Sequence, residues 1–302
     1  MHVDNFLGNI FVSCDRGCNF RLSIERIYMQ DFVHLHVHTQ YSLLDGQASV
    51  SRLVDKAMKD GMKGIAVTDH GNMFGIKEFT NYVNKKNERA KGEIKDLKKR
   101  IAGIESGEIE CEDKEAEIAD CRAKMAEAES KLFKPIVGCE MYVARRTMDK
   151  KEGKPDQSGY HLIVLAKNEK GYHNLIKLVS HAWTRGYYMR PRTDRSELEK
   201  YHEGLIVCSA CIGGEVPKKI INDQLEEAEE AVRWYKNLFG DDYYLELQRH
   251  KATVPRANHE AYPLQQKRMP SCWSLPGNMT LRLSAPMTST LWMKRMQKRT
   301  TA

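Results

Sequence analysis

The histidine-rich segment His-Leu-His-Val-His-Thr at 34–39 constrains this chain more than any other feature. Side chains two apart in an extended strand share a face of that strand. The segment therefore predicts a strand with His34, His36 and His38 on one face and aliphatic residues on the other. Asp45 comes seven residues after the last of these histidines and adds a carboxylate.

A second polar cluster ends the next apolar run. Residues 64–67 are Gly-Ile-Ala-Val, and Thr68-Asp69-His70-Gly71 comes directly after them. Sites in α/β folds lie at the carboxyl ends of strands. Imidazole and carboxylate groups are also the ligands of metals that activate water. The two clusters together predict a metal site, whereas a single histidine at a strand end is more often a hydrogen-bonding residue.

Short apolar runs alternate with amphipathic segments through most of the chain, which favours a parallel α/β arrangement. The expected strands are 65–68, 135–139, 162–166, 205–208 and 243–247. The expected helices are 51–60, 172–183 and 223–239.

Residues 84–131 have a different composition, rich in Lys, Glu and Ala and without Pro. Apolar residues recur there at three-, four- and seven-residue steps on either side of Ser106-Gly107. This pattern predicts an inserted antiparallel helical hairpin. A solvated insertion without a role in chemistry is the more economical interpretation, and a partner-binding arm is the alternative.

Several motifs together resemble the PHP domain and, more narrowly, the amino-terminal PHP domain of the bacterial DNA polymerase III alpha subunit family. The matching segments are 32–46, 71–75, 135–143, 161–166, 204–211 and 244–248. The resemblance covers roughly 29–267 and keeps the motifs in order. It implies a distorted (β/α)7 barrel of the PHP type, incomplete here at its C-terminal end and carrying the hairpin insertion.

The resemblance also implies a divalent metal cluster, with zinc or manganese as the expected ions. The ligands carried over onto this chain are His36, His38, Asp45, His70, Glu140, His161 and Cys211. Glu140 is expected to bridge two ions. Asp69 is expected either to orient His70 or to cap the strand end, and His34 either to support the ligands or to have a structural role. The Asp and His that end the family pattern are missing, so we expect this chain by itself to hydrolyse little. Magnesium is expected only for a polymerase domain, whose palm aspartates have no counterpart in this chain.

Three functions follow from the resemblance. The first is a metal-dependent phosphoesterase, in particular a 3′–5′ exonuclease on DNA, within a replicative DNA-directed DNA polymerase. The expected partners are DNA, a proofreading exonuclease subunit, a sliding clamp and a clamp loader. The second is a stand-alone phosphatase of the histidinol-phosphatase kind. The third is a non-catalytic scaffold that binds the proofreading subunit.

The two ends of the chain differ from the rest. Residues 1–28 match nothing in the family, and we interpret them as the result of a wrongly assigned translation start. Residues 268–302 hold six Lys or Arg and no acid, which leaves a net charge of about +1 for 29–267 out of the chain's +7. Reading the codons for 286–292 in another frame yields Asp whatever codons are used, and His two positions later if the Ser289 codon ends in C, so the tail is interpreted as frame-shifted.

The composition bounds the cellular context. Because residues 29–267 are nearly neutral, the net charge of the chain is not evidence for DNA binding. Eight scattered Cys, no leader peptide and no membrane-length apolar run predict a cytoplasmic protein without membrane contact.

Overall fold

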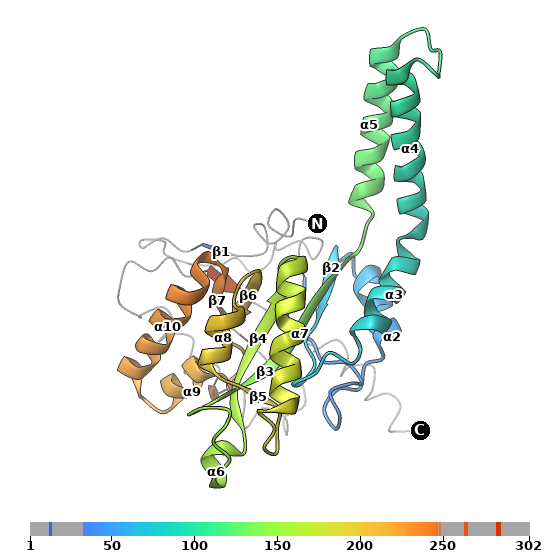
Figure 1. The fold of residues 1–302 in the computed structure, drawn as a ribbon. Helices are drawn as coiled ribbons and strands as arrows, with labels where there is room; N and C mark the ends of the chain where they lie inside the picture. Colours follow the sequence, from blue (N-terminus) through green and yellow to red (C-terminus); the bar gives the residue numbers. More distant parts are fainter. Residues whose placement is uncertain (1–11, 14–32, 247, 249–262, 265–281, 285–302) are drawn as a thin grey trace, which may run out of the picture.

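A curled mixed sheet with helices along its outer face forms the body of the protein, as seen in a computed structural model (Figure 1). The structure describes residues 12–13, 33–246, 248, 263–264 and 282–284. The strands are β1 (Val12–Ser13), β2 (Gly64–Val67), β3 (Lys134–Ala144), β4 (Gly159–Ala166), β5 (Arg192–Thr193), β6 (Leu205–Cys208), β7 (Tyr243–Glu246) and β8 (Arg282–Ser284). The helices are α2 (Val50–Lys59), α3 (Ile76–Lys86), α4 (Glu88–Ser106), α5 (Lys114–Ser130), α6 (Gly153–Asp156), α7 (Glu169–Thr184), α8 (Arg195–Tyr201), α9 (Glu215–Ile221) and α10 (Leu225–Phe239), followed by the 3-10 turn η3 (Gly240–Asp242).

The strand order is β1-β8-β7-β6-β4-β3-β2, with β5 beside β3. Its curl forms a half-barrel, which confirms the expected incomplete barrel (Figure 1). The expected parallel arrangement holds only in part, because β4 runs antiparallel to both β3 and β6, and β1 runs antiparallel to β8. As a result, the amino end of β4 lies at the same edge as the carboxyl end of β3.

The two faces of the sheet have different roles, and the alternation along β3 and β4 separates them. Cys139, Met141 and Val143 share the outer core with residues of α7 to α10. Glu140 and Tyr142 must then face the interior, because side chains alternate along a strand. The register pairs Tyr142 with His161, which therefore lies on that same inner face.

The first histidine segment is not a strand, so that prediction is wrong. Residues 33–39 are extended, with a bend at 35–36. They lie along β2, since the amides of Ala66 and Thr68 donate to the carbonyls of His34 and Val37. Because of the bend, side chains two apart in this segment do not stay on one side. Some face the inner core, and others face the core under α2 and α3.

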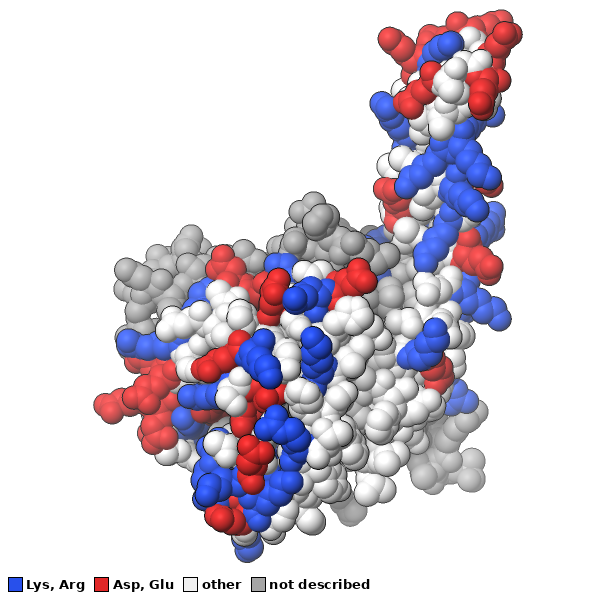
Figure 2. Space-filling view, in the orientation of Figure 1, with Lys and Arg blue, Asp and Glu red and all other residues white. Residues whose placement is uncertain are grey.

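The predicted helical hairpin is confirmed as α4 and α5, which project from the body as one arm (Figure 1). The helices pack on each other through Ile94, Ile104, Cys121 and Ala128. Gly107 ends α4 in a left-handed conformation with a φ of 81°. Figure 2 shows Lys and Arg along the middle of the arm and a mainly acidic tip.

No helix in the described part of the chain has the length and apolar character needed to span a membrane. The interpretations of 1–28 and 268–302 fall outside the described residues, except for the paired strands β1 and β8.

Candidate metal centre

Glu140 is the centre of the histidine cluster. It lies inside β3 rather than after a strand, and its side chain is fully buried. Oε1 is 2.9 Å from Nδ1 of His161 and 3.3 Å from Nε2 of His36. Oε2 is 2.5 Å from Nδ1 of His70 and 3.5 Å from Nε2 of His38. A single carboxylate therefore has four imidazoles around it, two at each oxygen.

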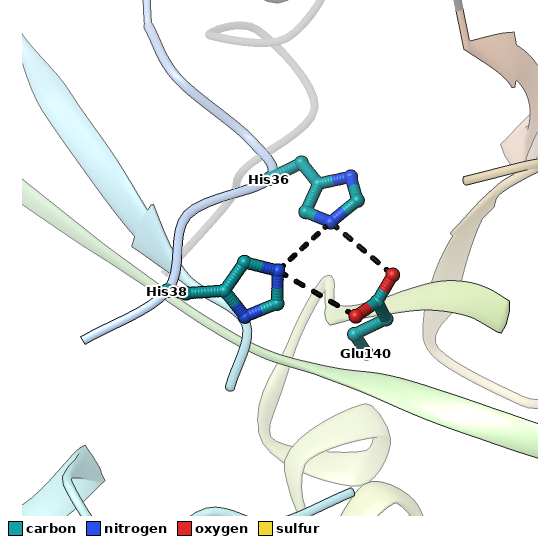
Figure 3. A group of neighbouring side chains, drawn as sticks. All are labelled: His36, His38 and Glu140. Atoms are coloured by element: carbon teal, nitrogen blue, oxygen red, sulfur yellow. Dashed lines mark hydrogen bonds and ion pairs between the residues drawn. The ribbon is translucent and has the colours of Figure 1, made fainter. Parts of the chain in front are cut away.

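The ring nitrogens of His36 and His38 converge with Glu140 (Figure 3). Their Nε2 atoms are 3.2 Å apart. Two neutral imidazoles cannot both direct lone pairs at each other over this distance without a proton or a cation between them.

Asp45 and Cys211 complete the predicted set. Asp45 Oδ2 is 2.8 Å from Nε2 of His70, and it comes from the exposed loop before α2. Cys211 follows β6, and its Sγ is 3.5 Å from Nδ1 of His161 and 3.7 Å from Oε1 of Glu140. All seven predicted ligands are thus brought to one edge of the half-barrel.

The donor set fits divalent cations. Three overlapping groups each place three ligand atoms within 4.8 Å of one another: His36, His38 and Glu140; His38, Asp45 and His70; and His70, Glu140 and His161. Nδ1 of His70 and Oε2 of Glu140 are buried without a hydrogen-bond partner although they are adjacent. Buried polar atoms are normally satisfied, so these two atoms fit a site in which a divalent cation would be their partner.

The buried carboxylates of this site require positive charge nearby. Burial alone would raise the pKa of Glu140, but the adjacent imidazoles of His161, His36 and His70 hold it well below its usual value. Burial would lower the pKa of His36, but the Glu246 and Glu140 carboxylates raise it to about 10. His38, also buried, has its pKa lowered to about 4 and is neutral.

Asp69 and His34 were each expected either to support the ligands or to have a structural role. Asp69 does not contact the ring of His70. It accepts hydrogen bonds of 2.7 Å from Thr39 N, Thr39 Oγ1 and Ser42 Oγ. His34 lies on the α2 side, where burial lowers its pKa to about 4 and the nearby charges are Asp60 and Lys56.

Glu246 belongs to the site and was missed by the sequence reasoning. It ends β7, is buried, and its Oε1 lies 2.8 Å from Nδ1 of His36. Gln248 donates to the same oxygen over 2.6 Å. The signal was present, because a carboxylate that ends a buried strand follows the same rule as Asp69 and His70.

Comparisons with known proteins agree with this geometry. The chain matches the PHP domain family over residues 34–250. It is 43% identical over 220 residues to the DNA polymerase III subunit alpha of Borreliella burgdorferi, covering 72% of this chain and 15% of that protein. The corresponding protein of Treponema pallidum is 39% identical over 221 residues, and that of Aquifex aeolicus 36% over 225, each again over 72% of this chain. The chain thus spans about 15% of the length of the curated relatives it matches.

Proposed function

This chain belongs to the PHP domain family, and from that premise we propose that it is a metal-dependent phosphoesterase domain acting on the 3′ end of a DNA strand. Its relatives are DNA polymerase III alpha subunits, matched over the PHP region only. The observation that carries the proposal is the buried Glu140 with an imidazole pair at each carboxylate oxygen. No positively charged Lys or Arg of the described part balances that carboxylate.

The ligands that would hold the ions are His36, His38, Asp45, His70, Glu140, His161 and Cys211. Bound zinc or manganese would supply a water of lowered pKa and would stabilise charge on the phosphoryl oxygens. Glu140 can offer one oxygen to each of two neighbouring sites, because His161 and His36 lie at Oε1 and His70 and His38 at Oε2. Asp45, the exposed ligand, lies nearest to solvent and therefore to an entering substrate.

The outer partners of these ligands fix their orientation. Ser42 has one hydroxyl hydrogen and donates it to Asp69, so Nδ1 of His38 must donate to Ser42 Oγ. Nδ1 of His36 likewise donates to Glu246. Nε2 of His38 is then unprotonated, and at Nε2 of His36 a bound cation would replace the proton that the neighbouring carboxylates favour.

The wider role is part of the same proposal. We assign the chain to the amino-terminal region of a replicative polymerase, with DNA, the proofreading exonuclease subunit, the sliding clamp and the clamp loader as partners. Nucleotidyl transfer itself would belong to the remainder of such a polymerase. For the chain by itself we propose weak phosphodiester hydrolysis at most.

The test compares the full chain with Glu140→Gln, and with Glu129→Gln on the exposed side of α5 as the matched control. Metal content is measured by mass spectrometry, and hydrolysis is followed on a labelled single-stranded oligonucleotide in manganese. Removing the central ligand should weaken metal binding by more than the roughly 10- to 100-fold that loss of an outer partner costs. Circular dichroism checks that both variants fold.

Other outcomes separate the competing functions. Cleavage of phosphate monoesters with no cleavage of oligonucleotide would replace the proposal with a small-molecule phosphatase. Binding of a proofreading subunit by a chain that takes up no metal would replace it with a scaffold.

A further inference from the structure

Three aromatic side chains form an exposed row beside the candidate metal centre. Phe74, Trp183 and Tyr187 are 62%, 41% and 48% exposed. The ring centroids of Phe74 and Trp183 are 5.8 Å apart, and those of Trp183 and Tyr187 are 5.6 Å apart and nearly parallel. Burial in the core does not explain three large rings that adjoin one another at the surface.

The row is fixed directly to the site. The indole Nε1 of Trp183 donates to the carbonyl of Gly71 over 2.8 Å, and Gly71 follows the ligand His70. Gly71 has a φ of +61°, and a side chain there would collide with Pro191 and the ring of Tyr142. The end of α7 and the 187–191 turn therefore pack against the strand end that carries His70.

Tyr142 and Arg190 connect the row with the ligands. The Tyr142 ring lies 5.1 Å from the ring of His161 and 6.3 Å from that of His70. The guanidinium of Arg190 lies 5.8 Å from the centre of the Tyr142 ring. Arg190 is exposed and has no ion pair within the described part, whereas nearby Arg185 is paired with Asp149 and Glu197.

We propose that Phe74, Trp183 and Tyr187, together with Arg190, are a base-stacking subsite that holds unpaired nucleotides of a single DNA strand next to the metal centre. This inference rests on the proposed function, because it names how the substrate of that same site is held. Every base offers a face to stack on an exposed ring, and the Arg190 guanidinium beside Tyr142 suits a phosphate close to the metal centre. The hydrogen bond to Gly71 holds the indole in place, so less conformational entropy is lost on binding.

The composition of the row also occurs at protein interfaces, where Trp, Tyr and Arg are enriched. Two features favour nucleic acid. The hydrogen bond from Trp183 to Gly71 ties the row to the strand end that carries His70, and Arg190 has no acidic partner among the described residues.

The test measures binding of a short fluorescent oligothymidylate by anisotropy in EDTA, so that hydrolysis plays no part. Phe74→Ala and Trp183→Ala should each weaken binding by about fivefold or more. Trp183→Phe keeps a ring and should retain most of the affinity. Tyr172→Ala is the matched control, since Tyr172 is an exposed ring at the other end of α7 and should not matter.

An abasic strand with the same number of phosphates should bind the wild type weakly and should not distinguish the variants. The inference is overturned if Phe74→Ala and Trp183→Ala bind as tightly as the wild type, or if the abasic strand binds as well as oligothymidylate. It is also overturned if the two variants change only the self-association of the chain in sedimentation. Ring-dependent binding by a chain that takes up no zinc or manganese would contradict the proposed function and leave this subsite standing.

Discussion

At the scale of single residues, one hydroxyl holds the first half of the site together. Ser42 is fully buried between two histidine-bearing segments. Its Oγ donates to Asp69 over 2.7 Å and accepts from His38 Nδ1 at 3.0 Å and from the amide of His70 at 3.1 Å. Asp69 therefore acts on two ligand segments through Ser42, although it touches neither imidazole.

The first prediction follows from these three bonds. Ser42→Ala leaves His38 free to adopt the other tautomer and leaves two buried donors without an acceptor. We expect metal affinity to fall by about 10- to 100-fold and the free energy of unfolding to fall by about 1–3 kcal/mol. Calorimetric metal titration and urea unfolding measure these two effects. Ser130→Ala, at an exposed hydroxyl on α5, is the control, and equal metal affinity in both variants would contradict the argument.

The second prediction concerns the residue that the sequence reasoning missed. Glu246→Gln keeps the shape of the side chain but removes the charge that fixes His36 through Nδ1. We expect about a tenfold loss of metal affinity with little change in the folded structure. The exposed Glu199→Gln serves as the matched control. If Glu246→Gln bound metal as the wild type does, Glu246 would have only a structural role.

At the scale of elements, the sequence predicted the types and order of the helices and strands better than their extents and directions. The two-histidine spacing was sufficient to bring His36 and His38 together, yet the strand it implied is bent at 35–36. The apolar run after Glu140 could have indicated that β3 continues to Ala144. The direction of β4 could not be predicted, because alternation along a strand is the same in either direction.

A buried asparagine clamps the base of the arm, and this clamp supplies the third prediction. Asn87 is buried before α4, and it donates to the carbonyl of Phe133 and accepts from its amide over 2.7 and 3.0 Å. Both ends of the insertion are thereby tied together. Asn87→Ala should lower the free energy of unfolding by about 1–3 kcal/mol and speed hydrogen exchange at the base of the arm. Asn84→Ala, exposed and bonded only to Lys91, should change neither quantity; similar exchange in both variants would refute the clamp.

At the scale of the whole molecule, the candidate ligands come from segments that are far apart along the chain. The loop before α2, the ends of β2 and β6, and the inner faces of β3 and β4 all contribute. Cations held by these ligands would link segments that are otherwise connected only through the pairing of neighbouring strands. A ligand that binds the folded state and not the unfolded state stabilises the folded state by mass action.

The fourth prediction is therefore a metal-dependent shift of the unfolding midpoint. Zinc or manganese at about 100 times its dissociation constant should add about 2.7 kcal/mol, or roughly 5–10 °C for a domain of this size. Thermal unfolding followed by circular dichroism measures this shift.

Replacing 88–131 with a short linker should leave the shift intact, because Asn87 and Phe133 already bring the two ends of the arm together. Glu140→Gln should abolish it. A shift that survives in Glu140→Gln would mean that the stabilising ions bind elsewhere, and a shift lost with the arm would mean that the arm shapes the metal centre.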